Sequence, residues 1–194
     1  MKSPLLEKVV FLDKDGVINQ DSPEYIKSWA EVAFIPGSLD AISRLTRAKF
    51  SIILVTNQSA INRNLMTREG LDYMLTKLCH AVSDCGGQIT DIFYCPHAPE
   101  EDCGCRKPLP GLIYQACRRY AIDLASACMI GDSTRDIECG KAAGCGYNIL
   151  VKTGNGLAAE KELSEKGLFP EYIARDLLDA SDWLVTNHNP DPAA

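Results

Sequence analysis

The feature of this 194-residue chain that most restricts its fold is a regular alternation of short apolar runs with longer amphipathic stretches. The apolar runs are four to six residues long, which is typical of strands buried on both faces. The stretches between them place apolar residues three and four positions apart, and this spacing predicts helices. The alternation predicts an α/β fold with a Rossmann-like, doubly wound, mainly parallel sheet. We expect strands at 9–12, 51–56, 89–94, 127–131 and 147–151, and helices at 39–48, 67–85, 109–120, 134–143, 158–166 and 171–180.

The length of the chain indicates a single domain, over residues 1–186, that is large enough to bury a substantial core. Residues 20–36 show no helical or strand period, and we expect them to form an ordered flap beside the strand ends. Ser38 is expected to cap the helix that follows the flap. Near the end of the chain, 183–185 is expected to add an edge strand, and 187–194 to form a disordered tail.

Composition narrows the class of partner. The net charge of −6 and the isoelectric point near 5.1 argue against a nucleic-acid backbone as the main partner. No run of eighteen apolar residues occurs, and the N-terminus lacks the apolar region of a signal peptide. We therefore expect a cytoplasmic protein that binds a small molecule and does not bind a membrane.

Two carboxylates follow the first predicted strand. Asp13 and Asp15 are separated by one residue and are followed by Gly16. Along an extended backbone, side chains two positions apart point the same way, so both acids are expected to face one site. Ligands of open α/β sheets bind at this end of the strands, and Mg²⁺ relieves the repulsion between neighbouring carboxylates. The alternative is a solvated turn, because Asp and Gly are common turn residues.

Hydroxyl and amide groups follow the second predicted strand. Thr56, Asn57, Gln58 and Ser59 offer donors that suit phosphate oxygens. Taken alone, this stretch could equally be another turn.

Charged residues occur at two further strand or helix ends. Arg106 and Lys107 precede a predicted helix, where Lys107 could neutralise a phosphoryl group and Arg106 could bind a second anion. Asp132 and Asp136 follow the fourth predicted strand, where an Asp can also be no more than a helix cap. In a parallel sheet these groups converge with Asp13 on one edge. Such a convergence favours a catalytic site over four unrelated turns.

The four stretches, DKDGVIN, VTNQS, CRKP and GDSTRD, resemble in order the four motifs of the haloacid dehalogenase superfamily of phosphohydrolases. The resemblance implies that Asp13 is the nucleophile and Asp15 the general acid/base. It implies that Thr56 and Lys107 hold the phosphoryl group. It also implies that Asp13, Asp15 and Asp132 surround Mg²⁺.

Three of the nine cysteines lie in one loop. Cys95, His97, Cys103 and Cys105 fall within eleven residues and provide a complete tetrahedral ligand set for Zn²⁺. With no ligand position left open, such a site is structural, and it would fix the positions of the adjoining Arg106 and Lys107. The alternatives are a catalytic thiol, which is disfavoured because no second histidine is near, and unrelated loop cysteines. The other six cysteines are interpreted as small buried hydrophobes.

A zinc loop directly before the lysine motif, without a large cap domain, resembles the D-glycero-D-manno-heptose 1,7-bisphosphate phosphatases and, nearly as well, the histidinol-phosphate phosphatases. The resemblance implies removal of the 7-phosphate of the heptose bisphosphate, in lipopolysaccharide precursor synthesis, with Arg106 in substrate recognition. Two departures bear on the substrate. The chain reads NQSAINRN where the heptose enzymes usually read NQSGIARG, and Ser133 stands where they usually carry lysine, with Arg135 nearby as a substitute.

Three alternatives to the heptose substrate or to the enzyme class stay open at this stage. Histidinol phosphate or another small phosphate ester is the first. A phospho-acceptor switch is the second, although a second acid placed for proton transfer promotes turnover over storage. A catalytically dead, zinc-stabilised binding module is the third. Because one chain supplies the whole expected site, we expect a monomer.

Overall fold

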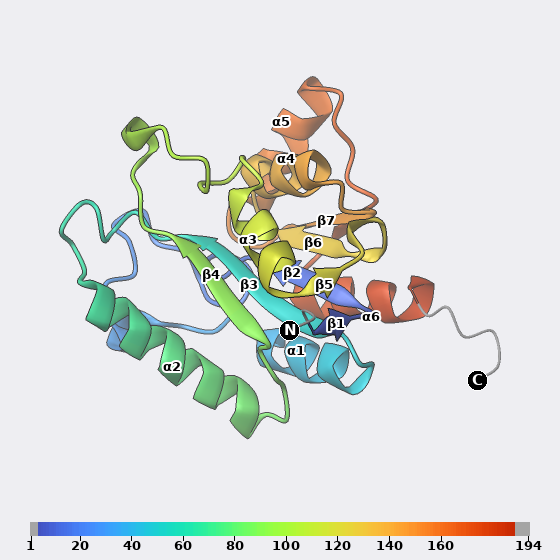
Figure 1. The fold of residues 1–194 in the computed structure, drawn as a ribbon, viewed down its shortest axis with the longest axis horizontal. Helices are drawn as coiled ribbons and strands as arrows, with labels where there is room; N and C mark the ends of the chain where they lie inside the picture. The colour runs from blue at the N-terminus through green and yellow to red at the C-terminus, as the bar shows by residue number, and fades with distance from the viewer. Residues whose placement is uncertain (1–3, 189–194) are drawn as a thin grey trace.

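The computed structural model describes residues 4–188, and its centre is a six-stranded sheet in which every neighbouring pair is parallel (Figure 1). The predicted fold class is confirmed. A separate pair, β1 (Leu5–Leu6) and β5 (Ala121–Ile122), is also parallel. The six strands run in the order β4 (Asp91–Cys95), β3 (Ser51–Asn57), β2 (Val9–Leu12), β6 (Cys128–Gly131), β7 (Tyr147–Val151) and β8 (Tyr172–Ala174).

Helices cover both faces of the sheet. The core on one face is formed with α1 (Ser38–Arg47), α2 (Arg68–Asp84) and α6 (Leu177–Asn187). The core on the other face is formed with α3 (Gly111–Arg119) and α4 (Thr134–Ala143), and α5 (Gly156–Glu165) packs beside α4. In the described part of the chain, three short 3-10 helices lie in the connections: η1 (Trp29–Glu31), η2 (Pro99–Glu101) and η3 (Leu124–Ser126).

The central strand β2 shows why its sequence is apolar throughout. Val10 and Leu12 belong to one core, whereas Val9 and Phe11 belong to the other. Side chains alternate between the faces of a strand, so a strand with helices on both sides buries every residue. Hydrophobic packing on two faces thus fixes β2, and with it the start of the loop at Asp13.

The prediction for residues 171–187 was wrong in its order of elements. Residues 172–174 form the edge strand β8, and the expected strand at 183–185 lies within α6. The helix starts late because the Asp176 side chain accepts a hydrogen bond from the Asp179 backbone N–H, which is a helix cap. The indole of Trp183 stacks on Tyr172 with ring centroids 5.0 Å apart, so helical packing decides its place. Asn187 ends α6 and was wrongly assigned to the tail, whereas 189–194 lie outside the described residues.

The remaining predicted elements are present with small shifts at their ends. Thr67 caps α2, since its hydroxyl accepts from the Gly70 N–H at 3.0 Å. Ser38 does not cap α1. The capping position is Gly37, and the Ser38 hydroxyl donates to the carbonyl of Ile18 at 2.7 Å. None of the helices found in residues 4–188 is both long and apolar enough to cross a membrane.

Candidate active site

The polar stretches singled out in the sequence meet where β2, β3 and β6 end. The order of the sheet reverses between β2 and β6, because the chain runs outward from β2 to β4 and then crosses back. Such a reversal leaves a crevice at the carboxyl ends of the strands, where ligands of α/β folds bind. A cavity of about 230 Å³ lies here, lined by residues of all four motifs and by Tyr25 and Ile26 of the flap.

The loop after β2 is held in one conformation. The backbone N–H of Asp13 donates to Ile130 at 3.0 Å, which extends the pairing of β2 with β6 by one residue. Gly16 has a φ of 81°, in the left-handed region that favours glycine. A Cβ at this position would lie 2.1 Å from Oδ2 of Asp132. Only glycine therefore allows the loop to pass this close to the fourth motif.

Lys107 lies between two carboxylates beneath this loop. Its Nζ is 2.9 Å from Oδ1 of Asp13 and 2.6 Å from Oδ1 of Asp136, and its side chain is 2% exposed. Burial acts to lower the pKa of Lys107, but the charges of Asp13 and Asp136 outweigh it and raise the pKa. The lysine is thus a fixed positive charge beside the expected nucleophile.

Three carboxylates form a group that fits a hard cation. Oxygens of Asp13, Asp132 and Asp136 lie within 4.8 Å of one another. Burial, opposed by Lys107 and reinforced by Asp136 and Asp132, raises the pKa of Asp13 to about 8. Burial and the charge of Asp136 raise the pKa of Asp132 to about 6. Buried acids that repel one another in this way gain from an ion such as Mg²⁺, whose preferred ligands are oxygens.

This group differs from the expected ligand set in one member. Asp136 was seen in the sequence as a second acid of the GDSTRD stretch but received no role, whereas Asp15 was expected as a ligand. The Asp15 carboxylate lies outside the group. It pairs with the ammonium of Lys14, and it accepts from Asn19 Nδ2 and Gln58 Nε2, each at 2.9 Å. These contacts hold Asp15 outside the group, although it lines the same cavity as the three acids.

The stretch after β3 divides into contacts with protein and contacts with the cavity. The Asn57 side chain bonds both backbone groups of Lys107, accepting at 3.1 Å and donating at 3.2 Å. Gln58 donates to the Thr56 hydroxyl at 3.0 Å as well as to Asp15. Ser59 lines the cavity with them. Asn57 and Gln58 thus position catalytic candidates, a relation that their sequence neighbourhood alone did not reveal.

Two further positively charged residues, Arg106 and Arg135, line the cavity in addition to Lys107. Arg106 donates from a guanidinium nitrogen to the carbonyl of His97 at 3.0 Å, which ties it to the cysteine loop. Arg135 is exposed, lies in the first turn of α4 and lines the cavity. Within residues 4–188 its guanidinium has no ion pair or hydrogen bond.

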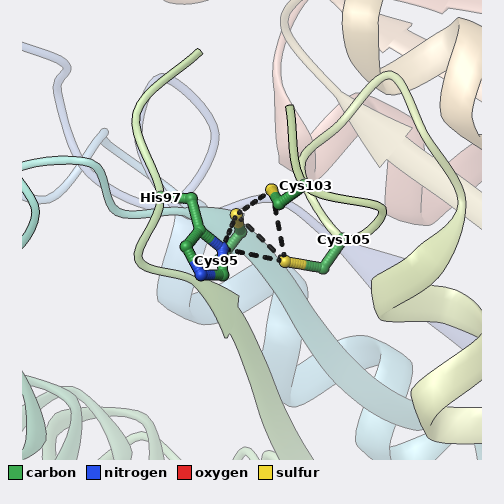
Figure 2. Close-up of side chains that lie close together, drawn as sticks. All are labelled: Cys95, His97, Cys103 and Cys105. Carbon is green, nitrogen blue, oxygen red and sulfur yellow. Dashed lines mark hydrogen bonds between the residues drawn. The ribbon is translucent and has the colours of Figure 1, made fainter. Parts of the chain in front are cut away.

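The cysteine loop gathers the four expected zinc ligands around one point (Figure 2). Five separations among the three sulfur atoms and Nδ1 of His97 fall between 3.2 and 3.6 Å. Ligands about 2.0–2.3 Å from a tetrahedral zinc ion lie roughly 3.5–3.8 Å apart, so the donor set fits zinc. Burial acts to raise the pKa of Cys103, yet N–H groups of Cys105 and Arg106 lower it to about 7. Burial raises the pKa of the Cys95 and Cys105 thiols, so the geometry of the four donors is what indicates that the cluster could hold Zn²⁺.

Comparison with known proteins identifies the family of this chain. A family model described as HAD-hydrolase-like matches residues 104–180. A D-glycero-beta-D-manno-heptose-1,7-bisphosphate 7-phosphatase of Bordetella bronchiseptica is 43% identical over 92% of this chain and 98% of its own. One from Pseudomonas putida is 42% identical over 88% and 99% of the two chains. The chain belongs to the haloacid dehalogenase-like phosphatases. Its expected class of enzyme, a phosphomonoesterase, is confirmed.

Solved structures of this phosphatase family support the same conclusion. The D,D-heptose 1,7-bisphosphate phosphatase of B. bronchiseptica, complexed with magnesium and phosphate, superposes with a TM-score of 0.86 at 42% identity, over 92% of this chain and 98% of that chain. The enzyme of Burkholderia thailandensis gives a TM-score of 0.69 at 34% identity, over 91% and 98%. Magnesium chemistry in this phosphatase is thus consistent with its own group of three acids.

The sequence of this phosphatase did not reveal the residues that hold other site residues in position. Lys14 is 1% exposed, and besides Asp15 it donates to Asn19 Oδ1 at 3.2 Å. A buried lysine is rare without a partner. Its place between two acids in the sequence was the available signal. Asn155, which donates to Asp132 and Asp21, gave no such signal, because these residues lie 23 and 134 positions away in the chain.

Proposed function

We propose that this phosphatase removes the 7-phosphate of D-glycero-β-D-manno-heptose 1,7-bisphosphate. The observation that carries the proposal is similarity along nearly the whole length to enzymes named for this substrate, at 36–43% identity for several of them. Only the names of the relatives specify the anomer. A role in the synthesis of lipopolysaccharide precursors follows from the same substrate.

In the proposed first step, an oxygen of Asp13 attacks the phosphorus of the 7-phosphate. The bond from phosphorus to the sugar oxygen breaks, and Asp15 gives its proton to that oxygen, so a neutral hydroxyl leaves. In the second step water attacks the aspartyl phosphate and Asp15 takes the proton of the water. Inorganic phosphate leaves, Asp13 is again a carboxylate and Asp15 is again protonated.

The neighbours of Asp13 support this division of roles. Lys107, fixed 2.9 Å from Asp13, would bind an oxygen of the phosphoryl group, and the Thr56 hydroxyl would bind another. Mg²⁺ held by Asp13 and Asp132, with Asp136 close by, would offset the negative charge of the phosphoryl oxygens. Gln58 and Asn19 hold Asp15 in reach of the cavity, apart from the three acids.

The cations at the cavity favour a substrate with a second phosphate. Arg106 and Arg135 both line it, and Lys107 is already balanced by two carboxylates. We assign the 1-phosphate to these arginines, whose planar guanidinium groups suit phosphate. Histidinol phosphate carries an amine and an imidazole in place of a second phosphate. Two arginines disfavour that substrate.

Released phosphate, measured with Mg²⁺ across candidate esters, tests the proposal. The heptose bisphosphate is expected to give the highest kcat/KM, and Asp13→Asn to abolish turnover. Best turnover on histidinol phosphate would replace the substrate and leave the class of enzyme. Inactivity of the wild-type protein on every ester would favour the binding module, and a single turnover that stops would favour the phospho-acceptor switch.

We also propose that the enzyme acts as a monomer in the cytoplasm. All residues assigned above come from one chain. The nine cysteines all lie among the described residues and none of them forms a disulfide, which fits a reducing compartment.

A further inference from the structure

Asn155 occupies the position before α5 where an Asn side chain ordinarily caps the helix, yet it forms no capping hydrogen bond. It bonds Asp132 instead. The Asn155 backbone N–H donates to Asp132 Oδ2 at 2.8 Å, and Nδ2 donates to the same oxygen at 3.2 Å. A residue type that favours N-caps is thus directed away from its own helix and toward the cavity.

The surroundings of Asp132 Oδ2 leave its carboxylate one orientation. A Cβ on Gly16 or on Gly154 would lie 2.1 or 2.2 Å from this oxygen. The hydroxyl of Thr153 donates to the carbonyl of Gly16 at 2.7 Å, which joins the two glycine segments. Within residues 4–188, the hydrogen bonds found to this carboxylate all end on Oδ2. Oδ1 is the oxygen left for a cation.

The same amide also contacts the flap. Asn155 Nδ2 donates to Asp21 Oδ2 at 3.3 Å. Asp21 and Asn155 line both the 230 Å³ cavity and a neighbouring one of about 510 Å³. Their contact is therefore part of the wall between the two cavities. A carboxamide has two N–H donors, and the two carboxylates, one from each side, match that number.

We propose that Asn155 is a positioning residue that holds Asp132 for the metal ion and holds the flap through Asp21. The inference rests on the proposed function, because it takes Asp132 as a ligand of the ion. It adds that the affinity for the metal ion and the position of the flap both depend on the side-chain amide of Asn155. Hydrogen bonds to metal-ligating carboxylates affect metal affinity strongly, typically about 10- to 100-fold.

The test measures Mn²⁺ binding by electron paramagnetic resonance, with Mn²⁺ in place of Mg²⁺ and no substrate. We expect Asn155→Ala to raise the Kd for Mn²⁺ about tenfold. Asp21→Ala removes only the flap contact, and we expect its Kd to stay within about twofold of wild type. Asn155→Ser repeats the measurement if Asn155→Ala is unstable, because serine also starts helices well and lacks the amide.

Flap position is followed by hydrogen–deuterium exchange over residues 20–36 and by KM. Asn155→Ala and Asp21→Ala are both expected to speed exchange in the flap and to raise KM. Unchanged exchange in both variants would overturn the flap half of the proposal. Wild-type Mn²⁺ affinity in both Asn155 variants would overturn the metal half and leave the proposed function intact. If wild type bound no Mn²⁺, or Asp132→Asn bound it equally well, the proposed function and this inference would both fail.

Discussion

Asp136 Oδ1 lies 2.6 Å from Nζ of Lys107, and neither side chain is more than 2% exposed. The other oxygen of Asp136 accepts from the hydroxyl of Ser133 at 2.6 Å and from its backbone N–H at 3.0 Å. Asp136 therefore starts α4 and fixes the lysine motif at once. Asp136, which the sequence showed only as a second acid near Asp132, therefore connects two motifs of the site.

Replacing Asp136 tests this double role. Asp136→Asn is expected to destabilise the fold by about 3 kcal/mol, because it leaves Lys107 with less compensation in a buried place. Turnover of p-nitrophenyl phosphate is expected to fall at least about 100-fold, as the lysine loses its fixed position. Denaturant unfolding and steady-state kinetics check both. Glu138→Gln on the same helix, whose partner Lys166 is 43% exposed, is the control and should shift stability by less than about 0.5 kcal/mol.

Loss of one zinc ligand should disturb the cations next to it. Cys103→Ser is expected to lower zinc content from about one equivalent to well below half, because structural zinc needs its full ligand set. Activity should fall as well, since Arg106 is tied to His97. Metal analysis and the melting temperature are the measurements. Cys85→Ser, an exposed cysteine outside the cluster, should match wild type, and equal zinc in both variants would contradict the assignment.

Arg135 should discriminate between a bisphosphate and a monophosphate. Arg135→Ala is expected to lower the ratio of kcat/KM for the heptose bisphosphate to kcat/KM for p-nitrophenyl phosphate by about tenfold, the loss of one charge-assisted hydrogen bond. The matched control is Arg118→Ala, an exposed arginine on α3 away from the cavity. An unchanged ratio would remove Arg135 from the proposed 1-phosphate site.

Glu171 should make stability depend on pH. Burial acts to raise the pKa of Glu171, but hydrogen bonds from Lys141 and Asn148 outweigh it and lower the pKa. A lowered pKa in the folded state gives stability that is present above the unfolded pKa and is lost as pH falls through the folded pKa. Glu171→Gln is expected to cost about 1 kcal/mol at pH 7, after allowance for solvent screening.

The cost of Glu171→Gln should shrink below about pH 4.5, the region in which an ordinary Glu takes up its proton. Urea unfolding at pH 7 and at pH 4 measures the difference. Glu165→Gln, in an exposed pair with Lys161 at 4.0 Å, should cost almost nothing at either pH. A cost for Glu171→Gln that is equal at both pH values would contradict the coupling.

The sequence by itself determined the doubly wound sheet, the four motifs in their order and the four residues that could hold zinc. These follow from local signals: β2 is apolar at every position because both of its faces are covered, and Cys95 to Cys105 lie within one loop. The sequence did not determine the order of strand and helix where the apolar pattern is short. At 171–187 the strand precedes the helix, and Trp183 of the helix stacks on Tyr172 of the strand. No local sequence pattern indicates this contact.

Only the tertiary structure shows which acids lie close together and which groups hold them. Asp136 lies near Asp13 because α4 begins directly after β6 and Lys107 bridges the two acids, whereas Asp15 pairs with Lys14 and Gln58. Asn155 reaches Asp132 and Asp21 across separations of 23 and 134 residues. Periodicity and spacing report forces between near neighbours in sequence. The field at a buried carboxylate comes from whichever side chains the fold brings within a few ångströms of it.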